Sequence, residues 1–142
     1  MGYTLRPRNK ELDSFHFGAF SFPLLLEACG YMFPCVHTVS RWYRVCGIDS
    51  RFENKEYPEI IIMGCGFRVA AEEARWMWRV ARNLVAVQRS LPEPPMDETG
   101  QPTWEYIAQS DNEWPRWIRR DFVDLFDKFT DWANRSRGFR IF

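Results

Sequence analysis

Apolar residues recur at helical spacing between residues 67 and 91, the longest stretch of the chain without Gly or Pro. Together with the main packed face listed below, Trp76, Val80 and Val87 give this segment an apolar arc of roughly 200°, at about 100° per residue. A helix that is apolar over more than half of its circumference must be covered from two sides. We therefore expect a central helix over about 70–91, ended by Pro92. Its main packed face, spaced i, i+3, i+4, i+7, consists of Ala74, Met77, Trp78, Ala81, Leu84, Val85 and Gln88.

A second helical pattern runs over about 115–135, with Pro115 in its first turn. Its acidic residues lie outside the apolar face and form an acidic ridge of Asp121, Asp124, Asp127 and Asp131. Gly138 is expected to end this helix. The apolar face is about 120° wide and consists of Ile118, Phe122, Leu125, Phe126, Phe129, Trp132 and Ala133.

Three shorter segments predict strands. Aromatic residues alternate between Phe15 and Phe22, which favours a short strand or a packed loop near 15–20. The β-branched run at 58–63 predicts a buried strand, and the alternation at 139–142 predicts a terminal strand.

The remaining segments are connectors and one short helix. Residues 1–14 are polar and predict an extended arm, whereas 31–56 carry no clear pattern. Ser21 is placed to cap a short helix that Gly30 ends. Residues 92–103 are rich in Pro and predict a surface connector. The whole chain, 1–142, is thus predicted to form a single α+β domain, in which a small, mostly antiparallel sheet packs on the two principal helices.

The composition narrows the choice of partners. Positive and negative side chains balance at 19 each, so the chain has no overall attraction to a membrane, and duplex nucleic acid is not expected as a partner. The basic residues are 16 Arg and only 3 Lys. Arginine suits carboxylates, phosphates and aromatic faces, although a GC-rich genome raises the Arg share as well. Aromatic residues make up 17% and include seven Trp, which predicts a core rich in rings, with rings at a binding surface as the alternative.

The N-terminal segment lacks the apolar core of a signal peptide. The apolar run at 22–26 is too short to span a bilayer. Four Cys without tight spacing fit a reducing compartment. We therefore expect a cytoplasmic protein without a membrane partner.

Three patches resemble a family of small uncharacterised bacterial and phage proteins. They are residues 9–23, the entrance to the central helix at 66–74, and the tail at 121–141. In that family an Asn-Asp-Gly turn often precedes the central helix, and a Ser or Thr caps it. This chain departs from the pattern, with Gly-Cys-Gly at 64–66 and Ala70 at the cap position. The resemblance implies a single α+β domain and brings no activity, cofactor or catalytic residue.

Candidate catalytic and metal sites are few. The potential metal ligands that lie nearest to one another in the sequence are Cys29, Cys35, His37 and Cys46. Their thiol and imidazole groups suit zinc, but no pair has the C-x2-C spacing of a zinc site. Burial as small apolar residues explains the Cys more simply. A Cys nucleophile at Cys35 or Cys65, or the carboxylates of the acidic ridge, would be needed for an enzyme. We predict no catalytic residue, no metal and no cofactor.

Arginine and aromatic side chains occur together in three places. The central helix carries a basic stripe of Arg75, Arg79, Arg82 and Arg89, whose first three arginines form an Arg ridge with Trp76 beside it. The same mixture recurs at Arg41 and Trp42 and at Arg116 and Trp117. Three explanations stay open: salt bridges to the acidic ridge, a protein interface, or binding of an anionic ligand. The sequence also leaves open whether Arg68 and Arg140, both in expected strands, point at one pocket.

These features favour a non-enzymatic binding protein that acts stoichiometrically on a protein partner, as an inhibitor, an immunity protein or a phage counter-defence factor does. The first alternative is an Arg- and Trp-lined protein that binds or sequesters a phosphorylated or nucleotide ligand. The second is a small cysteine- or carboxylate-dependent enzyme. Self-association stays open.

Overall fold

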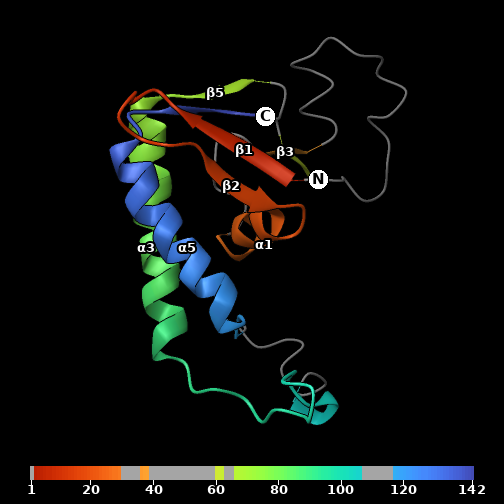
Figure 1. Cartoon of the computed structure of the whole chain (residues 1–142). Helices are drawn as coiled ribbons and strands as arrows, with labels where there is room; N and C mark the ends of the chain where they lie inside the picture. Colours follow the sequence, from red (N-terminus) through yellow and green to blue (C-terminus); the bar gives the residue numbers. More distant parts are fainter. Residues whose placement is uncertain (1, 30–35, 39–59, 63–65, 107–116) are drawn as a thin grey trace, which may run out of the picture.

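Two long helices lie below a four-stranded antiparallel sheet in the computed structural model (Figure 1). The structure describes residues 2–29, 36–38, 60–62, 66–106 and 117–142. The predicted α+β class, with a small antiparallel sheet and two principal helices, is confirmed. In chain order the elements are β1 (Gly2–Pro7), β2 (Phe15–Gly18), α1 (Ser21–Ala28), β3 (Val36–Thr38), β4 (Ile60–Ile62), β5 (Phe67–Val69), α3 (Ala71–Ser90), α5 (Arg120–Arg135) and β6 (Phe139–Ile141).

The first and last strands pair with each other in the middle of the main sheet, whose order is β2-β1-β6-β5. Thr4 and Phe142 exchange two main-chain hydrogen bonds of 2.9 Å each. β1 also pairs with β2, and β6 also pairs with β5, so every neighbour relation is antiparallel. The strand predicted at 139–142 is therefore present as an inner strand of the sheet.

Residues 2–7 form a strand, so the prediction of an extended arm over 1–14 is wrong for this segment. Leu5 is fully buried, and Pro7 closes the strand. Antiparallel pairs alternate between bonded and non-bonded along a ladder, and counting from the bonded Thr4–Phe142 pair places Pro7 and Phe139 at a non-bonded position. The missing N–H of Pro7 therefore leaves no gap in the sheet.

The run at 58–63 contributes a strand, but not to the main sheet. β4 pairs with β3, with Ile62 opposite Val36, and the two form a separate two-stranded sheet. The prediction that this segment shares a sheet with 139–142 is thus wrong. β5 occupies the position next to β6 instead, with Val69 directly opposite Phe139.

α3 agrees closely with the helix predicted at 70–91. Six of the seven residues on the predicted face are buried, and Trp78 is partly buried. Trp76 and Val87, however, are 46% and 42% exposed, so the wider apolar arc is wrong at these two positions. α5 lies alongside α3 (Figure 1) and packs against it.

α5 begins at Arg120, later than the predicted start at 115. The side chain of Gln88, buried near the end of α3, accepts a 2.7 Å hydrogen bond from the backbone N–H of Ile118. Arg120 donates to the carbonyl oxygens of Gln88 and Leu91 at 2.9 and 3.0 Å. These bonds hold residues 118–120 against the end of α3 and keep the N–H of Ile118 out of a helical turn.

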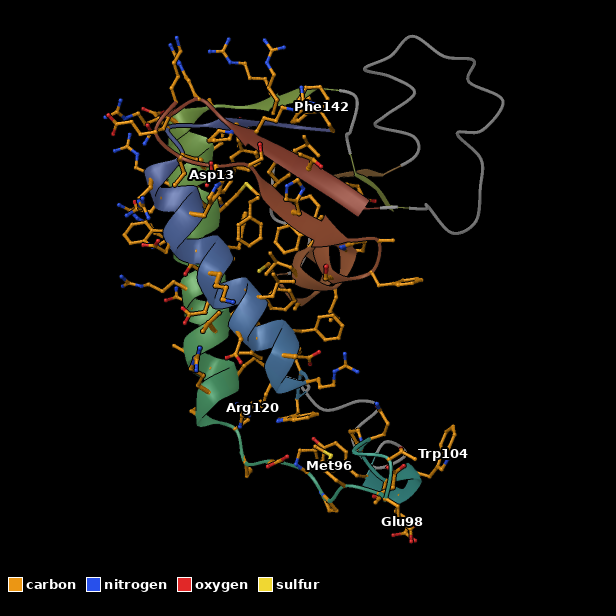
Figure 2. All side chains as sticks on the ribbon, in the orientation of Figure 1. Asp13, Met96, Glu98, Trp104, Arg120 and Phe142 are labelled. Atoms are coloured by element: carbon orange, nitrogen blue, oxygen red, sulfur yellow. The ribbon has the colours of Figure 1, made fainter. Side chains whose placement is uncertain are left out.

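Aromatic rings fill the space between the sheet and the helices (Figure 2). Phe17 and Phe22 stack with their ring centres 4.8 Å apart, and Phe17 also contacts Phe129 at 5.2 Å. Trp132 packs on Phe139, and its Nε1 donates a 2.7 Å bond to the carbonyl oxygen of Asp13. The predicted aromatic core thus ties both ends of the chain to α5.

The turn from α5 into β6 depends on Gly138, which has a φ of 91°. A Cβ at this position would lie 2.7 Å from the carbonyl oxygen of Val69. Glycine therefore allows both the left-handed backbone and the close approach of β5 to the turn.

We expect Gly138→Ala to lower the free energy of unfolding by about 2 kcal/mol, because it adds left-handed strain and a backbone clash. Gly18→Ala is the matched control: Gly18 has no positive φ, and its added Cβ meets only the Ser21 hydroxyl, at 3.5 Å. Urea unfolding of both variants measures the difference. Equal stability of the two variants would contradict this account of the turn.

Candidate functional site

Three arginines stand side by side across three strands. Arg140 on β6 lies directly opposite Arg6 on β1 and directly opposite Arg68 on β5. All three are exposed, whereas their strand neighbours Leu5 and Val69 are buried. Because successive side chains of a strand point to opposite faces, the three arginines stand on the sheet face away from the core.

The turns at the ends of these strands add two more arginines. Arg8 follows β1, and its N–H donates a 2.8 Å bond to the carbonyl oxygen of Gly138. The N–H of Asn9 bonds the carbonyl oxygen of Ser136 at 2.9 Å, so the segment after β1 is fastened to the turn after α5. Arg137 lies in that turn with a φ of 58°, the left-handed value that a residue with a side chain seldom adopts.

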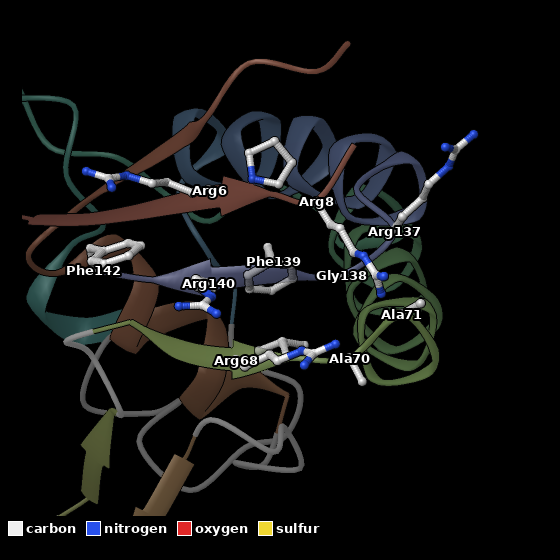
Figure 3. A pocket seen from close by; sticks show the side chains of 12 residues that line it. Arg6, Arg8, Arg68, Ala70, Ala71, Arg137, Gly138, Phe139, Arg140 and Phe142 are labelled. Carbon is white, nitrogen blue, oxygen red and sulfur yellow. The ribbon is translucent and has the colours of Figure 1, made fainter. Parts of the chain in front are cut away.

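The five arginines line one pocket of about 550 Å³, which we call the arginine pocket (Figure 3). In the figure Arg8 and Arg68 extend toward the start of α3, Arg137 extends outward from the rim, and Arg6 lies beside Phe142. No Asp or Glu is among the described residues that line it. These residues are Arg6, Pro7, Arg8, Arg68, Val69, Ala70, Ala71, Arg137, Gly138, Phe139, Arg140 and Phe142.

The charges of the arginine pocket are not neutralised by the described part of the chain. None of its five arginines lies within 4 Å of a described carboxylate oxygen. Arg6 instead covers an aromatic ring, with its Cζ 4.2 Å from the ring centre of Phe142. Like charges directly opposite each other in a sheet are destabilising. The row of Arg6, Arg140 and Arg68 therefore opposes folding unless an anion lies over it.

The start of α3 borders the pocket but contributes little to anion binding. Glu73 accepts a 2.8 Å hydrogen bond from the backbone N–H of Ala70, which occupies the donor that would otherwise face a ligand. Glu72 and Glu73 also place negative charge in the first turn. An anion here would be held by the arginines.

The predicted Arg ridge lies elsewhere, on the exposed side of α3. Arg75 and Arg79 are exposed and form no ion pair with a described residue. Arg82 places its Cζ 5.2 Å from the ring centre of Trp78. The salt-bridge explanation holds for Arg89 of the same stripe, which pairs with Asp124 and Asp127 of the acidic ridge at 3.4 and 2.9 Å, but no described carboxylate pairs with the other three.

The other predicted site residues are only partly visible. Trp117 is half-buried, and its indole Nε1 is buried without a hydrogen-bond partner among the described residues. For His37 only the backbone, in β3, is described. The remaining candidates lie outside the described residues: Arg41, Trp42, Arg116, Cys35, Cys46 and Cys65.

Cys29 is buried, and burial raises the pKa of its thiol to about 12. The thiol is therefore protonated at neutral pH, which is the form that neither attacks a substrate nor ligates zinc strongly. Over the ranges that the structure describes, no cluster of three His, Cys, Asp or Glu residues could hold a metal ion.

Sequence reasoning raised Arg68 and Arg140 but missed Arg6, Arg8 and Arg137. One signal was available: each strand carries an arginine between two apolar residues, as Leu5-Arg6-Pro7, Phe67-Arg68-Val69 and Phe139-Arg140-Ile141. This alternation predicts one buried face and one charged face. The register that aligns the three triplets comes only from the tertiary pairing.

Comparison of the chain with protein-family models, with curated proteins and with solved structures gave no match. The resemblance to small bacterial and phage proteins therefore stays a prediction. Among the helices that the structure describes, none has the length and apolarity needed to cross a bilayer.

Replacing Arg140 by Thr should raise the free energy of unfolding by about 1 kcal/mol in the absence of ligand, because it removes two repulsive cross-strand pairs. Arg68→Thr removes one such pair and should give about half of the gain. Added NaCl should narrow the difference between parent and variant by screening the charges. If urea unfolding gave either variant a lower free energy of unfolding than the parent, the result would contradict the repulsion between the arginines.

Proposed function

We propose that this protein binds a phosphorylated small ligand in the arginine pocket, without chemical turnover. The observation that supports this most directly is the presence of five arginines around about 550 Å³, with no described acid among the lining residues. Guanidinium groups pair with phosphate through two parallel N–H bonds. A ligand with several negative charges would remove the repulsion within the arginine row.

The size of the pocket favours a small ligand over a macromolecule. A volume of about 550 Å³ lies in the range of pockets that enclose small molecules. The chain as a whole is neutral, so its positive potential is local and gives no long-range attraction to a polyanion. Three of the five arginines stand on strands, which hold side chains more rigidly than loops do.

The lining chemistry favours binding over catalysis. The described lining residues are Arg, Pro, Val, Ala, Gly and Phe, whose side chains supply no carboxylate, imidazole, thiol or hydroxyl. General acid–base and nucleophilic catalysis require groups of those types. This set of side chains supports a binding or sequestering role.

Isothermal titration with inorganic tripolyphosphate tests the pocket. Arg140→Thr should weaken binding at least about tenfold, because a charge-assisted hydrogen bond contributes about 1.5–3 kcal/mol. Arg79→Ala is the control, since Arg79 is an exposed arginine of α3 outside the described pocket lining. No binding to the parent, or equal losses in both variants, would rule out the pocket as the site.

A protein partner at the Arg ridge is the second candidate function, favoured by one observation. Trp76 is 46% exposed on α3 and stands between Arg75 and Arg79 in the chain. Trp and Arg contribute most of the binding energy at many protein interfaces. This surface would suit stoichiometric action on a protein.

A pulldown from the host with the full chain as bait checks the second candidate. A specific partner should be lost with Trp76→Ala and retained with Arg140→Thr, because the two substitutions affect different surfaces. Light scattering of the purified chain distinguishes a second copy from another protein. Retention of the same partner by Trp76→Ala would contradict the role of this face.

A further inference from the structure

The arginine pocket has two chemically different ends along β6. At one end, Phe142 presents a ring that is 40% exposed and carries the Arg6 guanidinium at 4.2 Å. At the other end lie Arg8 and Arg137, beside Gly138. Phe142 lies four positions after Gly138, which corresponds to about 13 Å of strand. A site of this length is longer than a lone phosphate needs.

The middle of the pocket is the most positive part. Arg140 stands there between Arg6 and Arg68, in register across three strands. Neighbouring strands lie about 4.8 Å apart, so the row spans about 10 Å. Several phosphate groups joined in one chain would contact more than one of these arginines at the same time.

The pair of Phe142 and Arg6 has the chemistry of a base-stacking surface. Nucleic-acid bases stack on aromatic rings and on the flat face of a guanidinium. The pair is partly built in advance, because Arg6 already lies over the ring and Phe142 is fixed to Thr4 by two main-chain bonds. A sugar phosphate or inorganic phosphate would leave this apolar end unused.

From these contacts we infer that the ligand of the arginine pocket is a nucleoside di- or triphosphate, an inference that rests on the proposed function. The base stacks on the surface formed by Phe142 and Arg6. The phosphates lie over Arg140 and Arg68 and extend toward Arg8.

The described lining also indicates how the phosphate charge is neutralised. Magnesium held by a protein alongside a nucleotide is usually ligated by one or two carboxylates, and the described lining residues include none. The arginines therefore take the place of the metal. Excess Mg²⁺ should weaken binding, because it neutralises the phosphate oxygens that the arginines would contact.

The test compares ligands that differ in one part, titrated into the full chain at constant ionic strength with EDTA present. ATP should bind at least about fivefold more tightly than inorganic tripolyphosphate, which is the gain expected from stacking one base. Phe142→Leu should bring that ratio close to one and leave tripolyphosphate binding unchanged. Phe142 is 40% exposed and is not part of the buried core, so this substitution leaves the core intact.

Arg140→Thr should weaken ATP and tripolyphosphate alike, at least about tenfold, and Arg79→Ala should change neither. Excess Mg²⁺ should weaken ATP binding severalfold.

Three results would overturn the inference. Equal binding of ATP and tripolyphosphate, unaffected by Phe142→Leu, would leave a phosphate site without a base subsite, and the proposed function would stand. Tenfold tighter binding of a ten-nucleotide single strand than of ATP would assign the face to nucleic acid. No binding of either ATP or tripolyphosphate would remove the proposed function together with the inference.

Discussion

The pairing of β1 with β6 is the interaction on which the rest of this structure depends. It joins the first strand of the chain to the last, with Leu5 opposite Ile141, and both of these residues are fully buried. The same pairing sets Arg6 opposite Arg140 and brings Arg8 to the turn that follows α5. Core and candidate site therefore share one hydrogen-bonded ladder. A shift of one residue along it would exchange the buried face for the charged one.

The two faces of the sheet have opposite effects on stability. Below the strands, burial of aromatic and aliphatic side chains stabilises the fold. Above them, three arginines in register repel one another. Arg137 adds a left-handed backbone at the rim, a conformation that costs about 1–2 kcal/mol. Unfavourable features that lie together on one surface are typical of binding sites, where the ligand supplies the missing interaction.

The two helices divide their charges between structure and surface. Arg89 pairs with Asp124 and Asp127 across the contact of α3 and α5, at a position that is about half exposed, so it contributes little to stability. The buried Gln88 and the partly buried Arg120 fix the helix ends more firmly than these ion pairs do, through the hydrogen bonds from Ile118 to Gln88 and from Arg120 to the carbonyl oxygens of Gln88 and Leu91. Arg75 and Arg79 take no part in that contact and remain on the surface. The arginine pocket and the Arg ridge thus belong to separate faces, each with its own candidate partner.

Local pattern alone determined the helices of this protein and one face of each. Burial of one side of a helix requires apolar residues at every third or fourth position, so Ala74 to Gln88 and Phe126 to Ala133 were predictable from spacing. The strand at 139–142 and the acidic ridge followed from the same kind of pattern. Tertiary structure decided the strand partners, because the pairing of β1 with β6 joins residues more than 130 positions apart in the chain. It therefore also decided the arginine pocket, since Arg6, Arg68 and Arg140 become neighbours only when that register forms.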